Sequence, residues 1–204
     1  MSFAELAKLS DRAVLLIDRD TQELQKFGVS LAEQQKIKTL TTALKNYPTD
    51  EELVGLQSIT NRKKETAKEA VLINIREIMI RVRMVYGLQS PAYHYYGTKN
   101  MHNQSDTMLL RIANTVYKLA LEDFTTLEVK GLTMAELNFF LAAIQAFNNL
   151  LIAKEQAVRN RNKAKIERIN LANQLYDSIN LVFTSGKATF REDAAQYSDY
   201  IIYK

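Results

Sequence analysis

The sequence GVSLAE at residues 28–33 decides the expected fold, because GLTMAE repeats its pattern at residues 131–136, 103 positions later. Each copy has a glycine of the kind that ends a helix, followed by the Ser/Thr-x-x-Glu pattern that begins another. The flanking residues match at the same spacing: Leu6, Leu9, Leu16, Asp20 and Leu24 correspond to Leu109, Ile112, Leu119, Asp123 and Leu127. We therefore expect a helical unit that occurs twice in tandem.

A second match lies further along both copies, 99 positions apart rather than 103. Residues 61–64 (NRKK) correspond to residues 160–163 (NRNK), and Gly87 corresponds to Gly186. The sequence therefore predicts two helical repeats, over residues 1–87 and 105–186. These boundaries leave an irregular linker at 88–104, which contains both histidines, and a short helix with a C-terminal tail at 187–204.

The composition favours helices over strands. The 204 residues include six glycines and two prolines, whereas average usage is about 7% Gly and 5% Pro. Folds built from strands need these residues at most of their turns, so their scarcity favours long helices and few turns. We predict an all-α fold, an antiparallel helical bundle built from the duplicated unit, with a short extended C-terminal tail.

The two matched Asn-Arg segments leave two arrangements open. If both segments are turns, each repeat is a compact unit of three helices. If both are continuous, long helices run through residues 61–64 and 160–163. Residues 134–183 contain no Gly or Pro, and as a single helix they would span about 75 Å, at 1.5 Å per residue. We favour the compact arrangement, with a break within residues 159–163.

The patterns that most enzymes of this size would need are missing. The chain has no cysteine, which excludes disulfides and thiolate chemistry. Neither His94 nor His102 has a glutamate three residues before it, as helical di-iron sites require. The sequence also has neither GxGxxG nor the phosphate-binding P-loop pattern. We therefore predict no catalytic residue, no cofactor and no metal site.

Four polar residues interrupt apolar stripes of the predicted helices and are candidates for buried positions. They form two pairs between the repeats: Asp20 with Asp123, and Asn74 with Asn173. Buried polar groups need hydrogen-bond partners, so we interpret these residues as a network that fixes helix register. The alternative is a polar or ion-binding centre. A buried aspartate without a nearby cation should have a raised pKa.

A basic stripe is a second candidate feature. It would consist of Arg62, Lys64, Arg159, Arg161, Lys163 and Lys165. Such a stripe could contact phosphate backbones, but acidic residues interrupt it and the net charge is only +4. Binding of nucleic acid is therefore an alternative that we do not favour.

The best candidates for contact with a partner are tyrosines in the linker and the C-terminal tail, because tyrosine is enriched at protein interfaces. The tail could dock either on its own bundle or on a partner. The candidate residues are Tyr93, Tyr95, Tyr96, Tyr197, Tyr200, Ile201, Ile202 and Tyr203.

These patterns favour a non-catalytic structural or protein-interaction module, a subunit of a larger assembly formed by self-association or with a protein partner. The first alternative is a nucleic-acid-associated protein that uses the basic segments. The second is a small metal-binding or enzymatic helical bundle. We find no signal peptide and no apolar segment of the length that crosses a membrane, so we expect a cytoplasmic protein.

Overall fold

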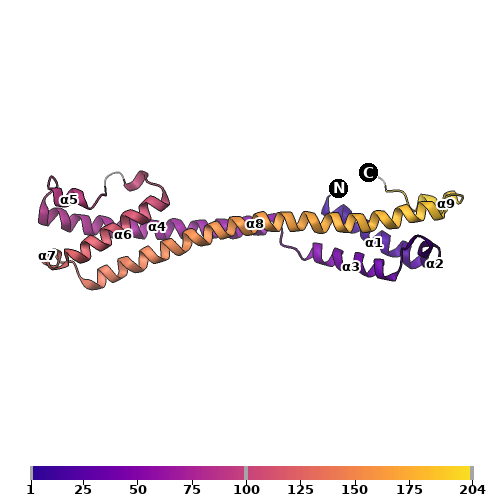
Figure 1. Ribbon diagram of the computed structural model, residues 1–204, viewed down its shortest axis with the longest axis horizontal. Coiled ribbons are helices and arrows are strands. Elements are labelled where there is room, and N and C mark those ends of the chain that lie inside the picture. The colour runs from indigo at the N-terminus through magenta and orange to yellow at the C-terminus, as the bar shows by residue number, and fades with distance from the viewer. Residues whose placement is uncertain (1, 99–100, 203–204) are drawn as a thin grey trace. The chain divides into compact units, whose positions relative to one another are not determined.

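The computed structural model describes residues 2–98 and 101–202, and it confirms the all-α fold. No strand occurs within these two ranges. The helices are α1 (Phe3–Arg19), α2 (Thr21–Leu24), η1 (Gln25–Phe27), α3 (Leu31–Lys45), α4 (Asp50–Tyr86), α5 (Pro91–Tyr95), η2 (Met101–Asn103), α6 (Asp106–Glu122), α7 (Phe124–Glu128), α8 (Met134–Thr189) and α9 (Ala194–Ser198) (Figure 1).

The chain forms two compact units, and one of them is discontinuous in sequence. Unit 1 contains Met1–Asp50 together with Arg161–Lys204, and unit 2 contains Glu51–Asn160. The boundaries therefore differ from those of the predicted repeats. A compact unit and a sequence repeat are different properties, so the predicted repeats stay a prediction.

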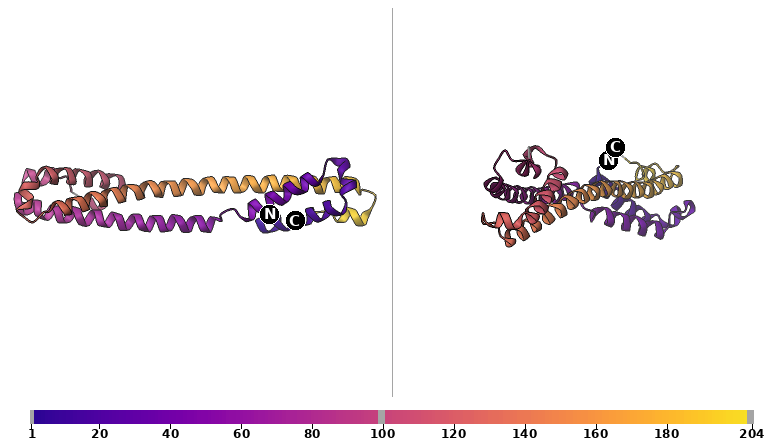
Figure 2. Two further views of the ribbon diagram at one scale, coloured as in Figure 1. Left: turned by 90° about the horizontal axis from the view of Figure 1, so that it is seen from below. Right: turned by 60° about the vertical axis from the view of Figure 1, so that its left-hand side comes forward.

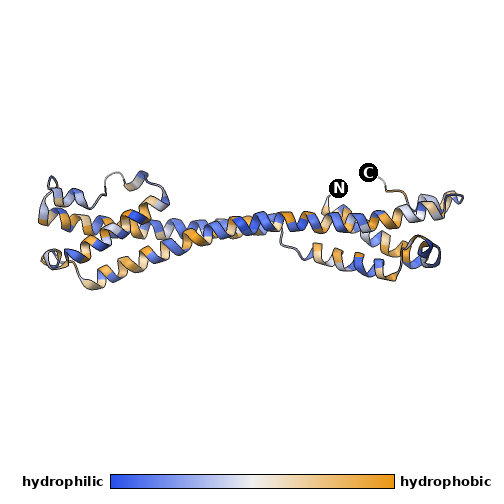
Figure 3. Ribbon diagram, in the orientation of Figure 1, coloured by the Kyte–Doolittle hydropathy of each residue, from blue (hydrophilic) through white to orange (hydrophobic). Residues whose placement is uncertain are grey.

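Unit 2 is a helical bundle whose core lies between α4, α6, α7 and the first part of α8. Apolar side chains from all four helices meet there, as expected for amphipathic helices that each bury one stripe. The tightly buried members include Ile75 and Val82 of α4, Val116 of α6, Leu127 of α7 and Phe140 of α8. Figure 3 shows the apolar residues of these helices in orange.

Unit 1 is built in the same way from α1, α2, α3 and the last part of α8. Its core includes Ile17 of α1, Leu24 of α2, Ile37 of α3 and Val182 of α8. Figure 2 shows α1 and α3 beside the yellow C-terminal part of α8. The core therefore joins residues from both ends of the chain.

The helix-ending glycines have the predicted role in both units. Gly28 and Gly131 each have φ +81°, a left-handed conformation that glycine adopts at little cost. The predicted capping box at Thr133 is also present, because Glu136 N donates to Thr133 Oγ1 at 3.2 Å and Thr133 N donates back to Glu136 Oε2 at 2.8 Å. The corresponding prediction at Ser30 is wrong, since its side chain makes no capping hydrogen bond.

The favoured break within residues 159–163 is wrong, and so is the compact arrangement that depended on it. Both Asn-Arg segments are continuous helix, within α4 and α8. Pairs four residues apart support the helix here: Arg159 bonds Glu155 at 3.0 Å, and Gln156 bonds Asn160 at 2.8 Å. Asparagine is a weak helix former but not a helix breaker.

Gly186 does not end a helix, because α8 continues to Thr189. A Cβ atom at this position would lie 2.0 Å from Cδ1 of Tyr200, so the glycine makes room for that ring. The short helix predicted within residues 187–204 is α9, and the side chain of Asp193 caps its N-terminus.

Several local features occur once in each unit, at the positions that the first sequence match relates. Both α1 and α6 have 17 residues and a serine N-cap, Ser2 and Ser105. Asp20 and Asp123 then occupy the C-caps of these two helices. These parallels agree with a duplication, which stays a prediction.

Candidate partner-binding surface

Each unit contains one buried tyrosine that donates a hydrogen bond to an aspartate. Tyr200 Oη donates to Asp20 Oδ2 at 2.5 Å in unit 1, and Tyr96 Oη donates to Asp123 Oδ2 at 2.8 Å in unit 2. Both tyrosines are almost fully buried. Burial and the bond to an aspartate raise the pKa of each phenol above its ordinary value. These two tyrosines therefore hold their segments on the body of the unit to which they belong.

Arg19 completes the site around Asp20. Its Nε and Nη2 atoms donate to the two carboxylate oxygens of Asp20 at 2.9 and 2.8 Å. Burial by itself would raise the pKa of Asp20, but the hydrogen bonds from Arg19 and Tyr200 outweigh that effect and lower it. The raised pKa expected of an aspartate without a cation does not apply here, because the cation is the preceding residue.

The segment around Tyr200 is fixed by further contacts to α1. Arg12 donates to the backbone carbonyls of Asp199 and Ile201 at 2.5 and 3.3 Å, and Arg19 bonds the Asp199 carboxylate at 2.6 Å. The Phe190 ring stacks on Tyr200 with 5.6 Å between ring centroids. The C-terminal segment therefore docks on its own unit.

The remaining partner candidates differ in exposure. Tyr93 is half-buried against the core of unit 2, whereas Tyr95 is 73% exposed. Tyr197 and Ile202 are half-buried, and Ile202 packs against the core of unit 1. Tyr203 lies outside the described residues.

The predicted buried polar residues are not all buried. Asp20 is buried, Asp123 and Asn74 are half-buried, and Asn173 is exposed, which corrects its prediction. The reason is register: the buried residues of α8 include Leu175 and Val182, which lie 100 positions after the buried Ile75 and Val82 of α4, whereas Asn173 lies 99 positions after Asn74. The Asn74 side chain donates to the carbonyl of Ala70 within its own helix, at 2.8 Å.

Lys64 does not belong to a basic surface, because it is 3% exposed. Its ammonium group lies 2.5 Å from Glu65 and 2.7 Å from Asp106, which also accepts from Lys68 at 2.8 Å. Burial by itself would lower the pKa of Lys64, but its bonds to these two carboxylates raise it. Its role is therefore to join α4 to α6.

The other basic candidates are mostly neutralised by nearby carboxylates. Arg161 makes two bonds of 2.9 Å to Asp50, and Lys163 lies 3.7 Å from Glu167. Arg159 pairs with Glu155, as described above. Arg62 and Lys165 are exposed and form no ion pair with a described residue. The predicted basic stripe therefore loses Lys64, and the rest of it stays a prediction.

A row of exposed apolar residues on α4 was not anticipated. This outer row consists of Ile73, Ile80 and Met84, continued by Leu88 beyond the helix, with exposed fractions of 45, 53, 63 and 49%. The residues recur at spacings of seven and four, so they share one face of the helix, opposite to the buried Ile78 and Val82. These spacings could have revealed the row in the sequence, where only the core-facing stripe of this helix was considered.

A groove of about 590 Å³ lies beside the outer row. Its lining combines apolar side chains with two arginines of α4, Arg76 and Arg83, whose side chains are exposed. Arg76 also pairs with Glu69 at 3.0 Å. The lining residues are Arg76, Met79, Ile80, Arg83, Tyr93, Thr98, Met101 and Asn103.

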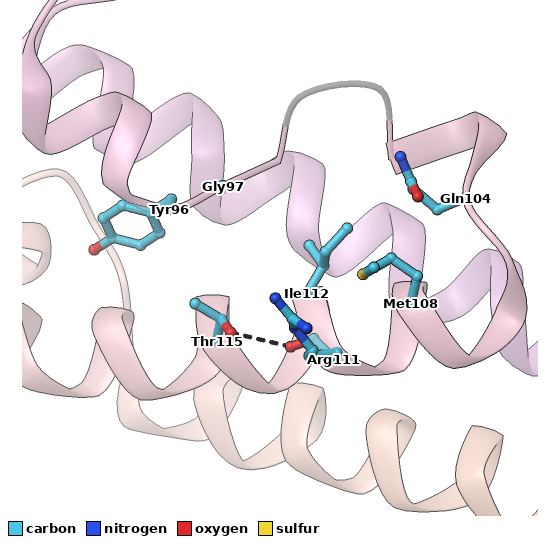
Figure 4. Close-up of a pocket in the computed structure, with 7 residues that line it drawn as sticks. All are labelled: Tyr96, Gly97, Gln104, Met108, Arg111, Ile112 and Thr115. Carbon is cyan, nitrogen blue, oxygen red and sulfur yellow. Dashed lines mark hydrogen bonds between the residues drawn. The ribbon is translucent and has the colours of Figure 1, made fainter.

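A smaller pocket of about 270 Å³ lies between α6 and the segment after α5 (Figure 4). Its lining residues are Tyr96, Gly97, Gln104, Met108, Arg111, Ile112 and Thr115. They include one cation but no carboxylate, imidazole or activated nucleophile, so they provide no acid–base pair. Among the described residues, no group of three or more His, Asp or Glu side chains could hold a metal ion.

In the part of the chain that the structure describes, one helix, α8, is long and apolar enough to cross a membrane by length and composition. Core helices of soluble proteins can have the same length and composition. In α8, 22% of the most apolar stretch is buried inside the structure. Leu137, Phe140 and Phe147 of this helix belong to the core of unit 2. The predicted absence of a membrane span and the predicted cytoplasmic location stay predictions.

Comparisons with protein-family models, curated proteins and solved structures find no match to this chain.

Proposed function

We propose that this protein is a non-catalytic helical module that enters a larger assembly by self-association through the outer row of α4. The observation that carries the proposal is the exposure of Ile73, Ile80 and Met84 on one helix face. Apolar residues spaced like this usually pack against a second helix. In a monomer these apolar side chains stay in contact with water. Burying them against a second copy would therefore lower the free energy.

The surroundings of the outer row suit a protein surface better than a reaction centre. Arg76 and Arg83 lie beside the apolar residues, and charges at the edge of an apolar contact favour correct alignment of the partner. Ile80 of the outer row lines the same groove as the two arginines. An aromatic side chain, Tyr93, also lines this groove, which agrees with the enrichment of tyrosine and arginine at interfaces.

Tyr96 and Tyr200 support the proposal in a different way from the one expected of them. In the structure each tyrosine bonds to an aspartate of its own unit. They hold the residues that follow the short helices α5 and α9 against these units, which gives the module a defined surface. Tyr95, which is exposed, remains a candidate for contact with a partner.

We also propose that the module arose by duplication. Besides the two Tyr–Asp bonds, a basic residue of the long helix contacts the first residue of the 17-residue helix in each unit. Lys68 bonds Asp106 at 2.8 Å, and the Arg168 guanidinium lies 5.2 Å from the centre of the Phe3 ring. The two basic residues are 100 positions apart and their partners are 103 positions apart, close to the spacings of the sequence matches, as expected of two copies that have diverged.

Two charge substitutions on the outer row test the proposal. In the double variant Ile80→Glu, Met84→Glu, two carboxylates would have to be buried in any contact that uses this face, so self-association should be lost. The control is Ile152→Glu, at a residue of α8 that is 60% exposed outside the row. The measurement is the mass in solution by light scattering over a hundredfold range of concentration.

The unmodified chain and the control should exceed the 23.4 kDa mass of one chain, while the double variant should stay at that mass with unchanged helix content. A double variant that still associates like the control would exclude the outer row as the interface. An unmodified chain that stays monomeric at every concentration would contradict self-association.

A further inference from the structure

Unit 1 is assembled from two chain segments that no loop connects directly. Residues 1–50 supply α1, α2 and α3, and residues 161–204 supply the end of α8 and α9. The chain between these segments, residues 51–160, folds as unit 2 with a core of its own. Unit 2, in contrast, is formed by one continuous stretch of chain, residues 51–160.

The contact between the two segments of unit 1 is extensive and specific. In its core, Ile17 and Ile37 of the first segment share one cluster with Ile179 and Val182 of the second. Polar contacts surround this core. They are Tyr200 to Asp20, Arg19 to Asp199, Arg12 to the carbonyls of Asp199 and Ile201, and Arg161 to Asp50.

None of these contacts requires the two segments to come from the same chain. The first segment of one copy and the second segment of another would form the same core, the same hydrogen bonds and the same ion pairs. Such an exchange leaves unit 2 of each copy intact. Within one chain the two segments have a high effective concentration for each other, and exchange loses this advantage. A higher protein concentration offsets the loss, because it favours contact between copies.

We propose that residues 161–204 of one copy dock on α1, α2 and α3 of a second copy, giving a closed dimer by reciprocal exchange. The partner is a second copy of this chain. It uses the same contact surface that joins the two segments within unit 1. This contact lies in unit 1 and is separate from the outer row, which lies in unit 2.

The ion pairs between the segments allow a complementation test. One full-length variant carries Arg19→Asp and Asp50→Arg, and the other carries Arg161→Asp and Asp199→Arg. The two reversals in each variant leave its net charge unchanged but create two like-charge contacts within its own unit 1. In an exchanged dimer of the two variants, both composite units regain opposite charges in all four contacts.

Both variants also carry Ile80→Glu and Met84→Glu, so that association through the outer row does not contribute. They are unfolded, mixed in equal amounts and refolded, and the mass in solution is measured by light scattering. We expect a complex of twice the 23.4 kDa chain mass that contains both variants in equal amounts. The control chain carries all four charge reversals, so opposite charges meet in both ion pairs of its own unit 1. It should have the same mass in solution as the chain that carries only Ile80→Glu and Met84→Glu.

A mixture that gives only single-chain mass, while the control chain folds normally, would overturn the proposal. A second measurement covers the case in which the charge reversals are too weak to direct pairing. The natural chain has no cysteine, so a donor dye on Leu15→Cys and an acceptor dye on Ala188→Cys can be placed on separate copies that also carry Ile80→Glu and Met84→Glu. Both positions are exposed. Energy transfer that grows with concentration supports exchange, and its absence after joint refolding excludes it.

Discussion

The contact between Gly186 and Tyr200 shows at the scale of single residues how the C-terminal segment is held. The Tyr200 ring packs directly on the helix backbone at Gly186, and any Cβ atom there would overlap the ring. The same ring makes an edge contact with Phe183, at 6.1 Å between centroids. Its hydroxyl reaches Asp20. One tyrosine thus joins the end of the chain to both α8 and α1.

The substitution Gly186→Ala should destabilise unit 1. The added methyl group must push away the Tyr200 ring, and overpacking of this kind usually costs about 1–3 kcal/mol. The matched control is Gly55→Ala in α4, where a Cβ meets nothing within 4 Å. That change should stabilise the protein by up to about 1 kcal/mol, because alanine is the better helix former. Chemical denaturation of the two variants checks both signs.

A gain in stability from Gly186→Ala similar to that from Gly55→Ala would contradict the packing of Tyr200 on Gly186. The comparison is informative because both glycines lie inside helices with ordinary helical backbone, so that helix propensity alone predicts a gain at each site.

The hydrogen bond from Tyr200 to Asp20 should make the stability of unit 1 depend on pH at both extremes. The raised pKa of the phenol means that its contribution is complete below pH 10, about the unfolded value, and is lost as the pH rises above it. The lowered pKa of Asp20 means that its contribution is complete above about pH 4 and is lost as the pH falls below that value.

The variant Tyr200→Phe should lower the free energy of unfolding by about 1–3 kcal/mol at neutral pH, because it removes a hydrogen bond to a charged group. It should also remove the part of the stability loss above pH 10 that ionisation of Tyr200 causes. The control is Tyr95→Phe, at an exposed residue, and it should change neither property. Hydrogen exchange of amides in α1 and α9, measured from pH 7 to 11, distinguishes the two. Identical profiles for both variants would contradict the role of this bond.

At the scale of secondary-structure elements, α8 is the feature that sequence reasoning judged least well. The absence of Gly and Pro from residues 134–183 indicated a single helix, and the preference for a break rested on typical helix lengths. Pairs such as Arg159 with Glu155 were visible in the sequence as i, i+4 spacings. The helix ends at Gly28 and Gly131 were predicted correctly, because a left-handed glycine has a strong local signal.

Asn162→Ala tests the continuity of α8 directly. Asn162 is exposed and lies inside the helix, and alanine is favoured over asparagine in helices by roughly 0.6 kcal/mol. We expect a small gain in stability and in the helical signal of circular dichroism. In a turn at residues 159–163, asparagine would be the favoured residue and its replacement would be neutral or destabilising.

At the scale of the whole molecule, the pairing of the two chain ends within unit 1 could not be predicted. Helix periodicity shows which residues of an element are buried, but it does not identify the element that covers them. Asp20 and Tyr200 are 180 residues apart, and no local pattern relates them. Asp20 and Asp123 were related by a sequence match, whereas the tyrosine partner of each was recognised only as a tyrosine in the linker or the C-terminal tail.

The exposed face of α4 could in principle have been found from the sequence. Ile73, Ile80 and Met84 follow the spacing of a helical stripe, but α4 also has a core-facing stripe. A helix with two apolar faces usually packs on both sides, and this inference requires knowing which face the bundle already uses. That information came from the burial of Ile75, Ile78 and Val82.

The measurement that tests the central claim most directly is light scattering coupled to size exclusion, with absorbance recorded at 260 and 280 nm at low and high salt. A module that assembles through an apolar row should form a discrete oligomer of the 23.4 kDa chain. That oligomer should be free of nucleic acid and should persist at high salt, because apolar contacts are not screened. A monomer that carries 260 nm absorbance removable by salt would contradict the claim and would support binding of nucleic acid through the basic residues.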